Sequence, residues 1–262
     1  MTGLEELASV DGRVTATAEA MVPMKDDGLY RGDGAFEVIR LYEGKPFALG
    51  DHLDRLERSS AAIRLEFDRA ALEREIDALL TEAGGPDGQL RLIVTRGGRR
   101  IAAVEPIPAH AETLRLATVT YSPTVILNGV KSLSYAANMQ ATRLAKEQGA
   151  DEAVLVQPDG TVLEPPTSAI FWVSAEGELR TPALDVGVLE SITRDRLVKA
   201  LDVEEGAWSV DDLRAAEEAF LASTTREIQA VSAIDGNALA EAPGHRTREA
   251  QEAFAATLGQ EL

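Results

Sequence analysis

The sequence predicts an α+β protein whose mixed sheets are flanked by helices. Strand patterns and helix patterns alternate irregularly along the 262 residues, without the regular βαβ repeat of a doubly wound sheet. Hydrophobic residues make up 45% of the chain, which is enough for a sizeable core. A chain of this length forms one large domain or two moderate ones. We expect a small N-terminal α/β domain at residues 1–121, an interdomain loop at 122–130 and a large C-terminal domain at 131–262.

The N-terminal half predicts strands around two helices. The turn at 43–46 separates the two strands of an edge hairpin. Asp51 is a candidate N-cap for a helix at 52–63, and glycines at 84 and 85 end a second helix at 69–83. The remaining expectations are a short strand at 13–18, a turn-rich loop at 25–36, and strands at 90–97 and 113–121.

The C-terminal half predicts more strands than helices. Apolar residues recur at helical spacing in some segments and form short continuous runs in others. The expected helices lie at 136–148, 193–202, 211–217 and 244–262, and the expected strands at 153–157, 161–163, 169–174, 178–180, 207–210, 218–223 and 228–234.

Composition argues against several classes of function. The net charge of −18 disfavours binding to nucleic acid or to an anionic membrane surface, which both need a basic footprint. The chain has no cysteine, and its three histidines are scattered, so we expect no disulfide, thiolate or metal site. No apolar run reaches membrane-spanning length, and the first residues lack a basic start and a hydrophobic stretch. We therefore expect a cytoplasmic protein.

Lys131 differs from the other four lysines of the chain in its surroundings. It lies between apolar segments, with 125–127 before it and Leu133 after it, whereas the others lie in loops, turns or charged helices. A lysine that forms a Schiff base needs a dry, ordered environment in which its amine loses its proton near neutral pH. Because most lysines lie in solvent, the local sequence alone also fits an ordinary lysine at the end of a strand.

Seven segments, taken together, resemble the class IV aminotransferases of fold type IV, which depend on pyridoxal phosphate. This family includes branched-chain and D-amino-acid aminotransferases and aminodeoxychorismate lyase. The resemblance implies a two-domain fold with the cofactor site at the domain interface, and Lys131 as the residue that carries the cofactor as a Schiff base. The segments follow the family's order and cover most of the chain: 32–47, 52–60, 90–97, 131–156, 159–173, 181–194 and 220–236.

The resemblance also implies the other cofactor contacts. Arg55 matches the arginine that binds the phosphate, Glu164 the partner of the pyridine nitrogen, and Leu189 a leucine on the ring face. A helix that opens at 191–193 offers backbone N–H groups to an anion. The predicted phosphate contacts are therefore Ser191, Ile192 and Thr193, together with Ser223 and Thr224; Ser191 and Ala169 depart from the common glycine and asparagine of the family.

The substrate contacts follow from smaller differences within the family. Glu37 and Val38 are similar to the pair found in D-amino-acid aminotransferases. Arg31 stands where many relatives have an aromatic or aliphatic residue, and its guanidinium could hold a substrate carboxylate through two hydrogen bonds; it could equally balance the aspartates around it. The usual D-amino-acid enzyme has an arginine and a histidine in the loop that here contains Arg99 and Arg100. The predicted substrate residues are Arg31, Glu37, Val38, Arg99, Arg100 and Tyr135.

The implied activity is transamination from D-alanine or D-glutamate to a 2-oxo acid in two half-reactions. Lys131 would move the proton between substrate and cofactor as general base and acid. The resemblance also implies a homodimer in which the Arg31 loop reaches the neighbouring site. Aminodeoxychorismate lyase activity and (R)-selective amine transamination are alternatives within the family. A non-catalytic interaction protein that merely keeps the fold is the alternative outside it.

Overall fold

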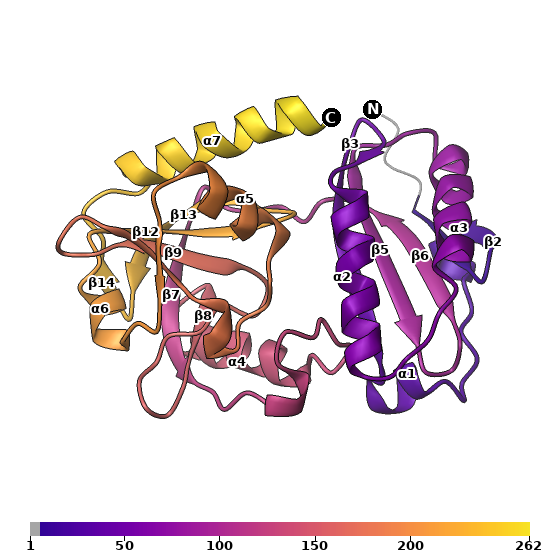
Figure 1. Ribbon diagram of the computed structural model, residues 1–262, viewed down its shortest axis with the longest axis horizontal. Coiled ribbons are helices and arrows are strands. Elements are labelled where there is room, and N and C mark those ends of the chain that lie inside the picture. The colour runs from indigo at the N-terminus through magenta and orange to yellow at the C-terminus, as the bar shows by residue number, and fades with distance from the viewer. Residues whose placement is uncertain (1–5) are drawn as a thin grey trace. The chain divides into compact units, whose positions relative to one another are not determined.

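The computed structural model describes residues 6–262 and contains two compact units (Figure 1). The first unit takes the chain up to Ala109, together with Val130–Tyr135 and Glu261–Leu262. The second unit comprises His110–Gly129 and Ala136–Gln260. Each unit has its own sheet and its own core.

The sheet of the first unit has six antiparallel strands in the order β2-β1-β6-β5-β3-β4. Two long helices and one short helix accompany it. The strands are β1 (Leu7–Val10), β2 (Arg13–Ala16), β3 (Gly34–Tyr42), β4 (Lys45–Pro46), β5 (Gly88–Thr95) and β6 (Arg100–Glu105), and the helices are α1 (Asp27–Arg31), α2 (Leu49–Ala62) and α3 (Arg69–Glu82).

One face of this sheet packs against α2 and α3. Side chains alternate along a strand, so every second residue of β3 faces the same side. Ala35 and Ile39 of β3 share a core with Leu56 of α2 and Ile76 of α3. This alternation places Glu37 on the helix-covered face and Phe36 and Val38 on the opposite face.

The sheet of the second unit has eight strands, seven of them in the order β11-β10-β9-β12-β13-β7-β8, with β14 paired to β13. The pairs β13–β7, β7–β8 and β10–β11 are parallel and the others are antiparallel, which confirms the predicted mixed sheets. The strands are β7 (Thr113–Thr120), β8 (Glu152–Val156), β9 (Ala169–Val173), β10 (Leu179–Pro182), β11 (Glu204–Gly206), β12 (Glu218–Ser223), β13 (Glu227–Ile234) and β14 (Asn237–Ala238).

Helices and loops cover both faces of this second sheet. All residues of β9 and β12 are buried, which explains why these strands have continuous rather than alternating apolar patterns. Trp172 of β9 is fully buried, and its indole N–H donates to Asp212 Oδ2 at 2.8 Å. The helices are α4 (Ala136–Glu147), α5 (Ile192–Ala200), α6 (Val210–Arg214) and α7 (His245–Glu261).

The structure differs from the predicted domain boundaries. We predicted that the first domain ends at residue 121, but the first unit ends at Ala109 because β7 pairs with β8 and β13 of the second sheet. Val130–Tyr135, which includes Lys131, belongs to the first unit, although we assigned residues 131–135 to the C-terminal domain. Residues 1–5, part of the predicted first domain, lie outside the described residues.

Some predicted elements also differ from the observed ones. The sequence did not predict β1 and β6, which pair with each other across more than 90 residues, and α1 replaces part of the predicted loop. Residues 161–163 form only isolated bridges, and the strand expected at 207–210 lies earlier, as β11. Among the described residues, no helix combines the length and the apolar character that crossing a bilayer requires.

We expect Leu221→Ala to lower the free energy of unfolding by about 2–5 kcal/mol, because it leaves a cavity in a fully buried part of β12. Leu184→Ala is the matched control: Leu184 is 43% exposed, so its loss should change stability by about 0.5 kcal/mol or less. Urea unfolding followed by circular dichroism measures both. Equal losses in the two variants would contradict the position of Leu221 in the core.

Candidate active site

Lys131 is held at the edge of β3 by its backbone. Its N–H donates to Ser59 Oγ on α2 at 3.1 Å, and its carbonyl accepts the N–H of Phe36 at 3.1 Å. The next residue, Ser132, forms an antiparallel bridge with Ala35. These bonds fix the lysine backbone against both a strand and a helix of the first unit.

The side chain of Lys131 lies against an aromatic pair. Its Nζ is 4.5 Å from the centre of the Phe36 ring, a cation–π distance. Tyr135 meets the same ring edge to face, with the ring centres 5.3 Å apart. Tyr135, a predicted substrate residue, is thus connected to Lys131 through Phe36.

Glu37, Arg55 and His52 form a buried group between β3 and α2. Arg55 donates from Nε to Glu37 Oε1 at 2.8 Å and from Nη2 to Oε2 at 2.6 Å. His52 Nδ1 lies 2.8 Å from the same Oε2. Glu37 and His52 are fully buried and Arg55 is 5% exposed, so the carboxylate and the guanidinium neutralise each other out of contact with water.

This environment shifts two pKa values. Burial by itself raises the pKa of Glu37, but the charge of Arg55 and the hydrogen bonds from Arg55 and His52 outweigh it and lower the pKa to about 2. Burial lowers the pKa of His52 below its usual 6.5, and the hydrogen bond to Glu37 offsets only part of this effect. At neutral pH the group therefore contains an ionised Glu37 and a neutral His52.

Glu37 does not lie where a substrate could contact it. We predicted Glu37 and Val38 as neighbouring substrate contacts, yet both oxygens of Glu37 are bonded to Arg55 and His52 beneath α2. Val38 faces the other side of the sheet because side chains alternate along a strand. His52 was not among the predicted site residues. Its spacing of three residues from Arg55 on a helix was the signal that could have identified it.

Glu164 and Leu189, which we predicted as two contacts of the cofactor ring, are hydrogen-bonded neighbours in the second unit. Glu164 Oε1 accepts the backbone N–H of Leu189 at 2.8 Å. The Glu164 carbonyl accepts the N–H of Leu155 in β8 at 3.1 Å, which fixes the backbone next to the carboxylate. The Leu189 N–H thus helps to orient the carboxylate.

Ser191 begins α5 as its N-cap. Its hydroxyl accepts the backbone N–H of Arg194 at 3.3 Å, and the next two residues, Ile192 and Thr193, are buried. The first N–H groups of a helix have no carbonyl partner within that helix, so this end attracts an anion. A serine in place of the family's glycine keeps this end of the helix properly capped.

Ser223 and Thr224 lie at the turn that joins β12 to β13. Ser223 Oγ is buried and has no hydrogen-bond partner among the described residues, so it can bond to a ligand. Arg226, in the same turn, pairs with the buried Glu152 and donates to Thr167 Oγ1 at 3.4 Å. The orphaned hydroxyl and the start of α5 fit a phosphate, while Lys131 and Glu164 fit the aldehyde and ring nitrogen of pyridoxal phosphate.

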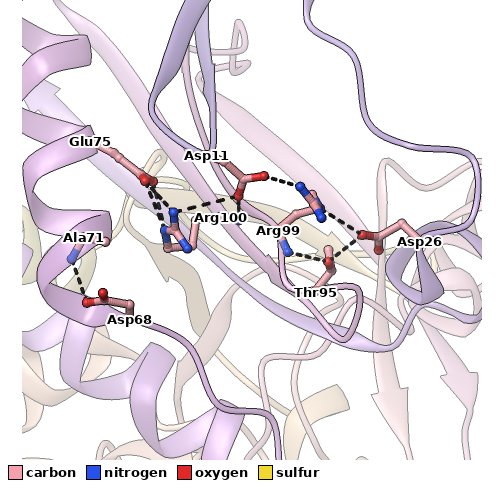
Figure 2. Close-up of polar contacts among 8 residues, drawn as sticks. All are labelled: Asp11, Asp26, Asp68, Ala71, Glu75, Thr95, Arg99 and Arg100. Carbon is pink, nitrogen blue, oxygen red and sulfur yellow. Dashed lines mark hydrogen bonds and ion pairs between the residues drawn. The ribbon is translucent and has the colours of Figure 1, made fainter.

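All three predicted substrate arginines have carboxylate partners, and Figure 2 shows those of Arg99 and Arg100. Arg99 pairs with Asp11. Arg100 donates from Nη2 to Glu75 Oε1 at 2.8 Å and also from Nε to the same carboxylate. By contrast, the side chain of Arg31 is 69% exposed and pairs with Asp27 of its own short helix. Among the described residues, no three His, Asp or Glu side chains gather as metal ligands.

Residues 34–234 match the family model described as amino-transferase class IV. The chain is 32% identical to the D-alanine aminotransferase of Bacillus licheniformis, over 93% of this chain and 94% of that protein. It is 33% identical to a putative branched-chain-amino-acid aminotransferase of Methanocaldococcus jannaschii, over 94% of each. It is 28% identical to the aminodeoxychorismate lyase of Bacillus subtilis, over 84% of this chain and 83% of that protein.

Solved structures superpose on this chain along nearly its whole length. A fold IV transaminase from Curtobacterium pusillum superposes with a TM-score of 0.84 at 27% identity and covers 98% of both chains. A hypothetical aminotransferase from Mycobacterium tuberculosis, in its form with bound pyridoxal phosphate (PLP), gives a TM-score of 0.85 at 25% identity, over 96% of this chain and 98% of that one. These similarities confirm the predicted fold.

We expect His52→Gln to make stability less dependent on pH. The folded protein keeps His52 neutral because burial lowers its pKa, whereas the unfolded chain protonates it below its ordinary pKa of 6.5. The stability contributed by neutral His52 is therefore complete above this pH and is lost as the pH falls below it. Urea unfolding at about pH 7.5 and about pH 5.5 should show a smaller loss in the variant than in the wild type. Identical losses would contradict the neutral buried His52.

Proposed function

Because the chain belongs to the class IV aminotransferases, we propose that it transfers the amino group of a D-amino acid, D-alanine or D-glutamate, to a 2-oxo acid. The observation that carries this choice is the exposed Arg31 guanidinium, one residue before the Gly32 cap that leads into β3. The similarity to the D-alanine aminotransferase of B. licheniformis supports the same choice.

The enzyme depends on pyridoxal 5'-phosphate, as its family does. When bound, this cofactor supplies an aldehyde that takes up the amino group and a ring that withdraws electrons. We assign its covalent attachment to Nζ of Lys131. Once a substrate amine had taken its place, Nζ would be free to take the proton from the substrate Cα as general base and to deliver it to the carbon of the cofactor as general acid. The backbone bonds of Lys131 to Phe36 and Ser59 fix the start of its side chain, and the Phe36 ring lies 4.5 Å from Nζ.

Glu164 is assigned to the ring nitrogen. Its carboxylate would hold a proton at that nitrogen and so favour electron withdrawal by the ring. The hydrogen bond from the Leu189 N–H occupies Oε1 and orients the carboxylate. Leu189 itself would pack against the ring face.

The phosphate is assigned to Arg55, to the start of α5 (Ser191, Ile192 and Thr193) and to the hydroxyls of Ser223 and Thr224. A hydrogen bond to a charged group contributes about 1.5–3 kcal/mol. A helix end contributes about 0.3–1 kcal/mol, so Arg55 is the largest single contributor. Glu37 and His52 support this role, because their bonds keep the guanidinium in one orientation inside the first unit.

We assign the substrate carboxylate to Arg31, in the active site of a neighbouring copy of the chain. The segment around α1 exposes large apolar side chains, which supports contact with a second copy. They are Met21, Met24, Leu29 and Tyr30. A homodimer would cover them and carry Arg31 into the partner's site. Val38 and Tyr135 would line the substrate site.

Arg99 and Arg100 were the other predicted substrate arginines, but their guanidiniums are bonded to Asp11 and Glu75, so we assign them no direct contact with the substrate. The cytoplasmic location expected from the sequence stays a prediction.

Two other activities in the family are supported by specific relatives. Similarity to the branched-chain enzyme of M. jannaschii supports transamination of L-amino acids with apolar side chains. Similarity to the lyase of B. subtilis supports elimination from aminodeoxychorismate, which releases pyruvate and p-aminobenzoate without an amino acceptor. The enantiomer used and the need for an acceptor distinguish all three.

We expect the purified holoenzyme to lose its yellow absorbance when mixed with D-alanine or D-glutamate, but not with L-alanine or L-leucine. The amino group passes to the cofactor aldehyde in this half-reaction, and addition of 2-oxoglutarate should restore the colour. Lys131→Ala should bind the cofactor without any such cycle, because it lacks the amine that moves the proton. A response to L-leucine alone would favour the branched-chain activity, and p-aminobenzoate formed without an acceptor would favour the lyase.

We expect Arg31→Ala to raise the KM for 2-oxoglutarate about tenfold or more, because one charge-assisted hydrogen bond contributes about 1.5–3 kcal/mol. Arg74→Ala is the matched control, since Arg74 lies exposed on α3 and has no assigned role. Steady-state kinetics measures the KM, and absorbance measures cofactor content. Loss of bound cofactor in Arg31→Ala, or an equal change in Arg74→Ala, would contradict the assignment of Arg31.

A further inference from the structure

Asp26 is a buried carboxylate that joins two distant segments of the first unit. It is 2% exposed and lies immediately before α1, where its Oδ1 accepts the N–H of Gly28 at 2.8 Å. Its Oδ2 accepts the hydroxyl of Thr95 at 2.9 Å, across 69 residues of sequence. Thr95 is the last residue of β5. The bond therefore fastens the start of α1 to the end of that strand.

Two glycines make this close contact possible. A Cβ on Gly97 would lie 2.1 Å from Asp26 Oδ2, and a Cβ on Gly28 would lie 2.5 Å from Thr95 Cγ2. Real Cβ atoms do not approach other atoms so closely, so any larger residue at either position would push the segments apart. Glycine at position 97 thus leaves room for the Asp26 carboxylate, and glycine at position 28 leaves room for the Thr95 side chain.

The bonded pair of Asp26 and Thr95 is linked to two arginines that follow it in the sequence. Thr95 Oγ1 accepts the backbone N–H of Arg99 at 3.2 Å, and Arg99 Nε lies 4.0 Å from Asp26 Oδ2 (Figure 2). Arg99 then pairs with Asp11, and Arg100 connects the same aspartate to Glu75 of α3. The network runs from α1 through the turn after β5 to α3. Arg99 and Arg100 thus connect separate segments within the first unit.

The short helix α1 depends on such outside support. It has five residues, and an isolated helix of this length is unstable in water. At its far end, the Asp33 carbonyl accepts the N–H of Arg96 at 3.0 Å, and the Arg96 side chain pairs with the Asp33 carboxylate. Arg31 lies between these two attachment points, at the end of α1. Its position is therefore set by Asp26 and Thr95 on one side and by Arg96 on the other.

We propose that Asp26 and Thr95 are positioning residues that determine where the Arg31 guanidinium meets the substrate carboxylate. This inference rests on the proposed role of Arg31 in substrate binding. Neither residue is assigned a contact with the substrate. Their hydrogen bond limits the movement of α1, so that binding a carboxylate does not first require the loop to become ordered.

The test compares Thr95→Val with Thr95→Ser in the holoenzyme. Valine has nearly the shape of threonine but no hydroxyl, whereas serine keeps the donor. We expect Thr95→Val to raise the KM for 2-oxoglutarate about threefold to tenfold, the size expected for one lost hydrogen bond. The kcat and the absorbance of the bound cofactor should stay at wild-type values, because binding is weakened without a change in the chemical step. Thr95→Ser should restore the KM.

Hydrogen exchange of the holoenzyme, read by mass spectrometry, provides a measure that does not depend on activity. Peptides that cover 25–33 should exchange faster in Thr95→Val than in Thr95→Ser and the wild type, whereas peptides from α3 should not. Unchanged exchange in this segment would overturn the proposed attachment. A kcat that falls while KM stays constant would overturn the positioning role.

Arg31→Ala, assayed in parallel, distinguishes a failure of the positioning role of Asp26 and Thr95 from a failure of the substrate-binding role of Arg31. A raised KM in Arg31→Ala with a wild-type KM in Thr95→Val would overturn this inference and leave the proposed function intact. A wild-type KM in both variants would overturn the proposed role of Arg31, and the positioning role with it.

Discussion

The buried bond between Glu37 and Arg55 is the interaction on which the first unit depends. An ionised group without a partner is strongly disfavoured away from water, so each residue is stable there only because the other is present. The two charges come from β3 and α2, and their pairing fixes the helix against the strand at one place. It also orients the guanidinium assigned to the cofactor phosphate. Removing either partner would therefore affect folding and cofactor binding together.

The same strand organises the other groups of this unit. Glu37 lies on the helix-covered face of β3, and Phe36, on the opposite face, contacts the amine of Lys131. Near its first residue, β3 also forms a bridge with the segment that contains the lysine. Just before β3, α1 carries Arg31. Lys131, Arg55 and Arg31, to which we assign the cofactor, its phosphate and the substrate, are thus all positioned relative to one strand. The hydrogen bonds of Asp26 fix α1 to the end of β5.

The second unit places its groups differently, at the ends of elements. Glu164 follows the turn after β8, Ser191 begins α5, and Ser223 and Thr224 lie where β12 turns into β13. Such positions expose backbone N–H groups and short hydroxyls, which suit a phosphate. The buried strands behind them form a fixed base, since β9 and β12 are covered on both faces.

Features that depend only on neighbouring residues could be predicted from the amino-acid sequence. The helices α2 and α3, with their periodic apolar residues, and the turn at 43–46 were predicted, because they are encoded within a few residues. Other features became visible only in the folded chain: β1 pairs with β6, β7 joins the second sheet, Glu37 bonds to Arg55, and Arg99 and Arg100 pair with Asp11 and Glu75. These partners lie far apart along the chain, and local propensity and periodicity carry no information about which distant residue will complete a sheet or neutralise a charge.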